Sequence, residues 1–599
     1  MTTNLQYHVT RLCPASGWRF EEVDFKCCIS GLATIQHTNI RITNYTLATR
    51  IALDHIRRTT LLQFRPTSHP PIAATMEVDA QTEWSFVDEV ECDAVLVDFK
   101  GEGKYPAKLH ARRVAKHLGV KQGLIYLPGT PSMTYEDSDN EAAFRQRRYF
   151  YYISGLDYPD CVVTYNIESD GLYVWIPPPN TGRSVIYNGT NPTEEEIKAI
   201  SDFDFVSRTT HLQQYLMFFT THKKGDIFLL HDYQAPEIAE KIECREGTSK
   251  TTKGRFDATN LKPAMNAARV IKTPFEIQRI RKANAITTKA HINVLRSIRH
   301  LENEAEIEGI FTGTCIASQA KNQSYGPIAG SGRNAGTLHY GANNEPLKGR
   351  QLVCLDAGCD WKNYASDVTR SFPISGKWTK EAKQIYDLVA LMQEECISMV
   401  KPGADYRRID MHAHEVATKG LMKLGLLQNG SYQELFRSGV STCFLPHGLG
   451  HYMGLEVHDV GAHGALLYFR KYDSNTERPE EAWKRSYLQM LSDLSSASPS
   501  LLEENMVITV EPGIYFNQWA FESVYLHDPR MAKYINQDLL TAYYPVGGVR
   551  IEDDLLVRRD GYENLTTAPK GDEALRIILG EDGEGAADEE KSGRRGWLW

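Results

Sequence analysis

The sequence lacks the features that mark membrane, secreted and nucleic-acid-binding proteins. No apolar run approaches the length of a membrane span, and the N-terminal stretch has no apolar signal-peptide core. The 11 cysteines are odd in number, scattered and without a CxxC pair, which favours reduced thiols over a disulfide framework. The net charge is −9, and nothing suggests the concentrated basic face of a nucleic-acid-binding protein. We therefore expect a cytoplasmic protein with neither a membrane nor a nucleic-acid partner.

The composition that is present is typical of a large globular protein. With 599 residues, of which 42% are hydrophobic and 24% charged, the chain is long enough for more than one domain. Between residues 76 and 262, β-rich runs such as GLIYLPG (123–129) and SVIYNG (184–189) alternate with helical patterns such as PAKLHARRVAKHLG (106–119). This alternation predicts an α/β domain over 76–262.

A second domain is predicted over residues 263–570. Thr273, Pro274 and Glu276 form a capping-box pattern, and apolar residues then recur at near-helical spacing, which predicts a helix that starts here. Two further helices are predicted over residues 381–400 and 411–425.

The two ends of the chain are predicted to lie outside these domains. Residues 1–75 have no sustained apolar period and end in the Pro-rich segment RPTSHPPIAATM, so we expect a poorly ordered extension, with Met76 as an alternative initiator. Residues 571–599 are expected to form a largely disordered tail, because their last twenty residues are acidic and then basic. A docking peptide is the alternative for the two terminal tryptophans.

Four carboxylates and one imidazole stand out, each beside glycine or proline at the end of a β-rich run: Asp356, Asp367, His451, Glu511 and Glu552. Such a hard, oxygen-rich ligand set suits a pair of divalent ions such as Mn²⁺ and suits zinc-thiolate chemistry poorly. The odd spacing of Asp356 and Asp367 would put them on opposite sheet faces unless the Gly-containing segment between them turns. Taken alone, two ordinary turn aspartates are the alternative interpretation.

Five stretches in this order resemble the aminopeptidase P and prolidase family. They are GPIAGSGRNAGTLHYGANN, LDAGCDWKNYASDVTRSFP, PHGLGHYMGLEVHDVGAH, VITVEPGIYF and VGGVRIEDDLLVRRDGYENLT. The resemblance covers residues 268–570 or so and implies the pita-bread fold, a curved and mostly antiparallel sheet. Upstream, FRQRRYFYYISGLDYPDCVV (144–163) resembles a block of the family's N-terminal domain. The overall fold class is therefore expected to be α/β (α+β).

The same resemblance implies the metal site and its chemistry. All five family ligands carry over, onto Asp356, Asp367, His451, Glu511 and Glu552, and the implied cofactor is two Mn²⁺ per chain, although other divalent ions suit these ligands. The family reaction uses a hydroxide held between the two ions. Glu511 is expected to act both as ligand and as general base, and Glu552 to bridge the ions.

The remaining site residues are also assigned by the resemblance. His339, His447 and His458 are expected to face the substrate, with His458 stabilising the oxyanion, although a lone histidine is more often a core or surface group. Arg550 is expected to hold a nearby carboxylate, with a surface ion pair as the alternative. Two tyrosines match family positions near the active site, and core packing is the alternative for both: Tyr325 and Tyr515.

The function that follows is an Xaa-Pro aminopeptidase, acting on a peptide with proline in second position. Prolidase, which cleaves Xaa-Pro dipeptides, is the alternative within the class, and a non-catalytic pita-bread module is the alternative outside it. One departure bears on substrate length. The arginine that prolidases use for the substrate carboxylate has no counterpart between Arg485 and Glu511, where the chain is Ser-rich over residues 485–505. The sequence leaves a homodimer open.

Overall fold

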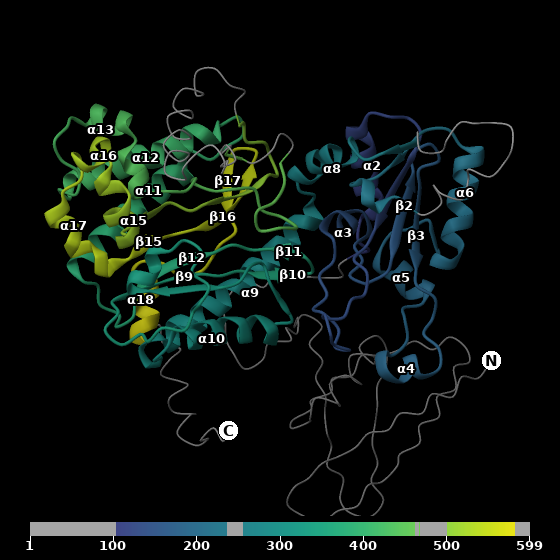
Figure 1. Cartoon of the computed structure of the whole chain (residues 1–599), viewed down its shortest axis with the longest axis horizontal. Coiled ribbons are helices and arrows are strands. Elements are labelled where there is room, and N and C mark those ends of the chain that lie inside the picture. Colours follow the sequence, from purple (N-terminus) through teal and green to yellow (C-terminus); the bar gives the residue numbers. More distant parts are fainter. Residues whose placement is uncertain (1–102, 237–254, 462–465, 468–499, 582–599) are drawn as a thin grey trace, which may run out of the picture. The chain divides into compact units, whose positions relative to one another are not determined.

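The computed structural model describes residues 103–236, 255–461, 466–467 and 500–581 (Figure 1). Four predictions lie wholly or mostly outside these residues: the poorly ordered extension over 1–75, the start of the N-terminal domain at 76, the Ser-rich segment 485–505 and the terminal residues 582–599. Among the described residues, no helix is both long and apolar enough to span a membrane.

The first domain is built on one mixed six-stranded sheet, in the order β4-β3-β2-β1-β5-β6. The pairs β1–β2 and β2–β3 are antiparallel, whereas β1–β5, β3–β4 and β5–β6 are parallel. The strands are β1 (Leu124–Pro128), β2 (Val162–Asn166), β3 (Gly171–Ile176), β4 (Phe205–Arg208), β5 (Ile227–Phe228) and β6 (Phe256–Asp257).

Both faces of this sheet are covered, because alternate residues of each strand point to opposite sides. In β1, Ile125 and Leu127 join a core with helices α2 (Ala107–Leu118), α3 (Arg148–Ser154) and α8 (Leu261–Val270). Leu124 and Tyr126 join a second cluster with α6 (Leu212–His222). Figure 1 shows α3 and α6 on opposite sides of β2 and β3. The predicted α/β layering of this domain is confirmed.

One predicted strand is wrong. The run SVIYNG forms a helix, α4 (Arg183–Asn188), followed by α5 (Glu194–Ile200). Gly182 and Gly189 flank α4 with φ of 58° and 72°, a backbone conformation that glycine adopts without steric cost. Ile186 is 81% exposed, so its β-branched side chain packs against no sheet. A strand needs a neighbour to pair with, and the short helix satisfies its backbone locally.

The helix predicted to start at Thr273 is present. Helix α9 (Pro274–Ser297) has Thr273 as N-cap, a full capping box with Glu276, and Pro274 in its first turn. The predicted helix over 381–400 is α11 (Lys380–Ser398). The one over 411–425 begins five residues earlier, as α12 (Tyr406–Lys423), because the Asp405 side chain caps it there. The other helices of this domain are α10 (Glu304–Ala317), α13 (Tyr432–Ser438), α15 (Gln518–Ser523), α16 (Pro529–Ala532), α17 (Gln537–Tyr543) and α18 (Asp572–Leu579).

The strands of the second domain pair antiparallel throughout the described residues. Their sheet orders are β12-β9-β8, β13-β16-β17, β14-β15 and β11-β10-β7. The bounds are β7 (Asn322–Gln323), β8 (Ile328–Ser331), β9 (Leu352–Asp356), β10 (Cys359–Trp361), β11 (Tyr364–Ala365), β12 (Thr369–Pro373), β13 (Val507–Val510), β14 (Gly513–Tyr515), β15 (Gly548–Arg550), β16 (Asp553–Arg558) and β17 (Gly561–Asn564).

Two helical layers enclose these strands. Helices α9, α10 and α18 share a core with β9, through Val353 and Leu355, while α11 and α12 share another with Leu352 and Cys354 of the same strand. In Figure 1, α9, α10 and α18 lie on one side of β9 and β12, and α11 and α12 lie on the other. The predicted, mostly antiparallel pairing of this domain is confirmed.

The predicted C-terminal tail starts too early. Residues 572–579 form α18, whose Ala574, Ile577 and Ile578 are buried against the α9 and α10 core. These three residues are spaced as on one helix face, so the helix has apolar surface to bury and is ordered by it.

Candidate metal centre and active site

A hairpin brings Asp356 and Asp367 together. Asp356 ends β9 and lies opposite Thr369 of β12, two residues after Asp367. Between them β10 and β11 form a tight hairpin whose turn residues, Lys362 and Asn363, have φ of 48° and 67°. The hydroxyl of Tyr325 lies within hydrogen-bonding distance of one oxygen of each carboxylate. The turn anticipated from the sequence is therefore present, and both carboxylates face one point.

His451 and Glu511 are placed beside this pair by β13. The backbone N–H of Thr509 donates to the carbonyl of His451 at 3.0 Å, and that of Glu511 donates to the carbonyl of Leu449 at 2.8 Å. The His451 Nε2 atom then lies 3.4 Å from Asp367 Oδ2 and 3.5 Å from Glu511 Oε1. Its other nitrogen, Nδ1, is 3.0 Å from the carbonyl of Tyr452. Donation from Nδ1 to that carbonyl leaves the lone pair of Nε2 facing the carboxylates, as a metal ligand requires.

Glu552 closes the cluster from the short segment between β15 and β16. Its backbone N–H donates to the carbonyl of Thr369 at 3.1 Å, and the Thr369 hydroxyl donates to its Oε2 at 2.6 Å. The other oxygen, Oε1, is buried and has no hydrogen-bond partner among the described residues. One donor atom each of Asp367, His451 and Glu552 lies within 4.8 Å of the others. An unpartnered buried carboxylate oxygen at such a convergence fits a cation.

The charges of the cluster also favour a bound cation. Burial raises the pKa of Asp367, Glu511 and Glu552, and neighbouring carboxylates raise each further, Asp356 in the case of Asp367. Among the described residues, the guanidinium of Arg550 is paired with one carboxylate of the cluster, donating from Nη2 to Asp356 Oδ2 at 2.6 Å. One guanidinium does not balance four carboxylates. The donor set, its spacing and its excess negative charge therefore fit divalent metal ions.

Arg550 also begins a chain of directed hydrogen bonds. Its Nη1 donates to the Tyr515 hydroxyl at 2.8 Å, and that hydroxyl lies 2.8 Å from Nε2 of His447. Nδ1 of His447 is 2.8 Å from the carbonyl of Gly448, so it donates there and leaves Nε2 to accept from Tyr515. Burial, and then Arg550, lower the pKa of His447 to about 4, so the ring is neutral near pH 7.

His458 and His339 complete a group of imidazoles beside the carboxylates. The ring of His458 lies edge-on to that of His451, with 4.3 Å between centroids. Partial burial, followed by His451 and His339, lowers the pKa of His458 to about 4. His339 is solvent-exposed and close enough to both His447 and His458 to lower the pKa of each. All eleven residues singled out from the sequence therefore lie in or around one site.

Known proteins share both domains and this site region. The model of metallopeptidase family M24 matches residues 278–559, and that of the aminopeptidase P N-terminal domain matches residues 110–228. The chain is 57% identical to a probable Xaa-Pro aminopeptidase of Sclerotinia sclerotiorum over 86% of its length and 95% of that relative. The chain belongs to the aminopeptidase P group of metallopeptidase family M24.

Further comparisons agree with this family, which the five sequence motifs predicted. A probable Xaa-Pro aminopeptidase of Botryotinia fuckeliana is 59% identical over 86% of this chain and 95% of its own. The solved structure of zinc-substituted Escherichia coli aminopeptidase P in complex with product matches with a TM-score of 0.62 at 25% identity, covering 80% of this chain and 99% of that one. The aminopeptidase P fold, with its N-terminal domain and pita-bread domain, is thereby confirmed.

Three residues of this aminopeptidase P family member were missed by sequence reasoning. Thr369 bonds Glu552 and, at 3.2 Å, accepts from Nε of Arg550. Asp554 accepts the backbone N–H of Asp367 at 3.0 Å. Asp410 of α12 accepts the backbone N–H of Leu449, inside the HGLGH stretch, at 2.8 Å. The first two stand within the quoted motifs and could have been examined there, whereas nothing near Asp410 in the sequence gives a signal.

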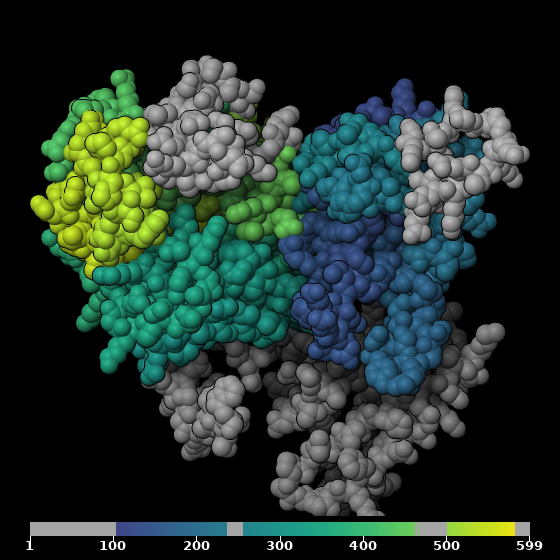
Figure 2. All heavy atoms as spheres, in the orientation of Figure 1, coloured from purple at the N-terminus to yellow at the C-terminus, as the bar shows by residue number. Residues whose placement is uncertain are grey.

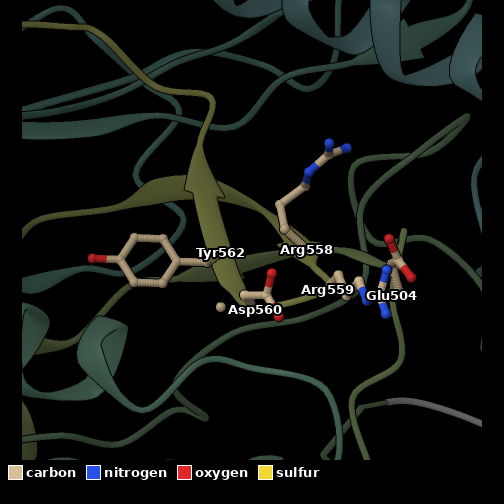
Figure 3. A pocket seen from close by; sticks show the side chains of 6 residues that line it. Glu504, Arg558, Arg559, Asp560 and Tyr562 are labelled. Atoms are coloured by element: carbon tan, nitrogen blue, oxygen red, sulfur yellow. The ribbon is translucent and has the colours of Figure 1, made fainter.

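A surface groove away from this site takes no part in it. Its volume is about 280 Å³, and it lies on the β16–β17 hairpin, lined by Glu504, Arg558, Arg559, Asp560, Gly561 and Tyr562. In Figure 3 the side chains of Arg558 and Tyr562 point in different directions from the hairpin and do not converge on one point. None of the family's ligand positions lines it, so we assign no catalytic role to this groove.

Proposed function

We propose that the protein is an Xaa-Pro aminopeptidase, which releases the N-terminal residue of a peptide whose second residue is proline. The observation that carries this proposal is the convergence of Asp367, His451 and Glu552, with Glu511 and Asp356 beside them, in a chain 57% identical to a probable Xaa-Pro aminopeptidase. The intact ligand set argues against the non-catalytic module.

The five predicted ligands would hold two divalent ions, and the proposal is that these are manganese. The donors are carboxylate oxygens and one imidazole, with no thiolate, which favours a hard ion such as Mn²⁺. Bound divalent ions supply an activated water as nucleophile and polarise the scissile carbonyl.

The chain's own groups would orient this chemistry and move its protons. Glu511 is proposed to accept the proton that the attacking water loses. Arg550 fixes Asp356 through the 2.6 Å bond, and Thr369 fixes Glu552 through its hydroxyl. The other oxygen of Glu552, Oε1, has no hydrogen-bond partner among the described residues, whereas the other oxygen of Asp356 faces the Tyr325 hydroxyl.

The histidines would contact the peptide. His447 and His458 have their pKa lowered to about 4, so both rings are neutral at pH 7 and do not repel the cations held next to them. A neutral imidazole can donate a hydrogen bond to the developing oxyanion, the role proposed for His458. His339, exposed at the edge of this group, is proposed to contact the peptide chain. Tyr325 and Tyr515 border the same space.

The test is a peptide panel with defined second residues. After chelation and dialysis, we expect cleavage of Xaa-Pro-Pro-Xaa only once Mn²⁺ is restored, and little cleavage of the matched Xaa-Ala-Pro-Xaa. Dipeptides of the form Xaa-Pro, assayed in parallel, separate aminopeptidase from prolidase. Cleavage restricted to the dipeptides would overturn the aminopeptidase proposal in favour of prolidase, and metal binding without cleavage of any peptide would favour the non-catalytic module.

Cellular location and assembly extend the proposal. Six cysteines among the described residues are buried and form no disulfide, which supports a reducing compartment such as the cytoplasm. Sedimentation equilibrium decides whether the protein is a monomer or a homodimer. Localisation of a tagged chain in cells tests the cytoplasmic assignment.

A further inference from the structure

A buried ion cluster holds loop 452–459, which follows His451 and contains His458. Nη2 of Arg269 lies 2.5 Å from Oδ1 of Asp459, and Nζ of Lys272 lies 3.3 Å from Oδ2. The three side chains are only 1–2% exposed. Arg269 belongs to α8, whereas Asp459 directly follows His458. Charges removed from water in this way need well-formed partners, so the cluster fixes the position of Asp459 firmly.

The loop 452–459 is tied through its backbone to both ligand-bearing segments. The N–H of Asp459 donates to the carbonyl of Tyr452 at 2.8 Å, and this is the carbonyl that Nδ1 of His451 contacts at 3.0 Å. The carbonyl of Gly454 accepts the N–H of Ala365 at 2.8 Å, two residues before Asp367. A shift of Asp459 would therefore reach the acceptor that orients the His451 ring.

Arg269 is itself held in place from the other side. Its guanidinium lies over the ring of Tyr149, 4.7 Å from the centroid. The segment containing the loop, drawn in green, lies next to the α8 region in the space-filling view (Figure 2). Lys272 interacts less exclusively with Asp459 than Arg269 does, because its Nζ also contacts the carbonyl of Val270 at 3.3 Å.

We propose that Arg269 is a positioning residue that acts through Asp459 to fix loop 452–459, and with it the orientation of His451 and His458. The inference rests on the proposed roles of these two histidines. Groups that orient metal-ligating histidines act by holding the ring in its binding geometry, and their loss commonly costs about 10- to 100-fold in metal affinity or activity.

The experiment compares three variants of the full chain. Among the described residues, Arg269→Met leaves Lys272 as the remaining ion-pair partner of Asp459. Lys272→Met, the matched control, leaves Arg269 in that place. Gly454→Ala removes no charge, but its Cβ would lie 2.3 Å from Oδ2 of Asp459 and so would displace the carboxylate. Each variant is checked for folding by its melting curve, then measured for Mn²⁺ dissociation constant by calorimetry and for kcat/KM.

We expect Arg269→Met and Gly454→Ala to weaken Mn²⁺ binding or lower kcat/KM by about 10- to 100-fold, and Lys272→Met to change either by less than about threefold. If Arg269→Met fails to fold, Gly454→Ala decides. The proposal would be overturned if every folded variant of Arg269→Met and Gly454→Ala kept the wild-type dissociation constant and kcat/KM. It would also be overturned if Lys272→Met lost as much as those two variants. Because metal binding is measured without substrate, the result does not depend on which peptide the enzyme cleaves.

Discussion

Replacing Glu511 by Gln separates chemistry from folding at this site. The amide has the shape of the carboxylate but cannot accept a proton as a base, and it is a weaker metal ligand. The backbone N–H of residue 511 still donates to the carbonyl of Leu449, so the strand should keep its place. Because burial, and then repulsion from Glu552 and Asp356, raise the pKa of Glu511, a neutral side chain at this position also avoids the cost of burying a charge in the metal-free protein.

The expected loss of activity follows from the two roles. Removing a general base alone costs about 10²–10⁴-fold in kcat, which corresponds to about 2.7–5.4 kcal/mol of barrier at 1.36 kcal/mol per decade. Loss of one ligand to the metals adds to this, and residues that act as one unit lose nearly everything on a single deletion. We therefore expect Glu511→Gln to lower kcat by at least about a thousandfold.

The measurement is steady-state kcat with saturating Mn²⁺, alongside a melting curve without metal. The melting temperature of metal-free Glu511→Gln should equal or exceed that of wild type. Glu504→Gln is the matched control, because the same change there affects an exposed carboxylate in the β16–β17 groove and should alter neither quantity. A Glu511→Gln enzyme with more than about a tenth of wild-type kcat would refute both roles of Glu511.

Three further predictions test other parts of the site. Asp367→Ala should lower the manganese retained per chain after dialysis, together with activity, and unchanged stoichiometry would show that Asp367 is no ligand. Tyr515→Phe removes the hydroxyl between Arg550 and His447. It should lower kcat/KM by up to about tenfold, the usual effect of losing one hydrogen bond, and elemental analysis should show no loss of metal. Burial raises the pKa of Asp410 to about 7, so the folded protein holds a proton that the unfolded chain releases near pH 4. This contribution to the free energy of unfolding is lost as pH rises from about 4 to 7, so the urea unfolding midpoint of the wild type should fall over that range. In Asp410→Asn the midpoint should fall less, and an equally large fall would contradict the prediction.

The parts of the fold that depend on local sequence were the most predictable. The start of α9 follows from Thr273, Pro274 and Glu276, which satisfy the free N–H groups of the first turn whatever surrounds them. The strand predicted over 184–189 failed because a strand exists only through its neighbours, and β propensity alone does not say whether one is present.

The site residues were predictable from motifs but not from physical reasoning on the chain alone. They span positions 325 to 552, and no spacing rule says that strands so far apart in sequence meet. A turn between Asp356 and Asp367 could be anticipated, because the segment joining them contains a glycine. The bond from Thr369 to Glu552 could not, because it depends on how β12 pairs with the segment before β16.

Arg269 and Asp410 mark the limit of sequence reasoning. In the sequence each is an ordinary charged residue of a helix, and such residues usually face solvent. Both side chains are buried: Arg269 is 2% exposed and lies over the ring of Tyr149, and Asp410 is 1% exposed and accepts the N–H of Leu449. Both hold the chain on either side of the same ligand, since Asp410 accepts the N–H two residues before His451 and Arg269 binds the carboxylate eight residues after it. A ligand histidine in a glycine-rich loop has little rigidity of its own, so buried polar side chains from two helices, α12 and α8, supply it.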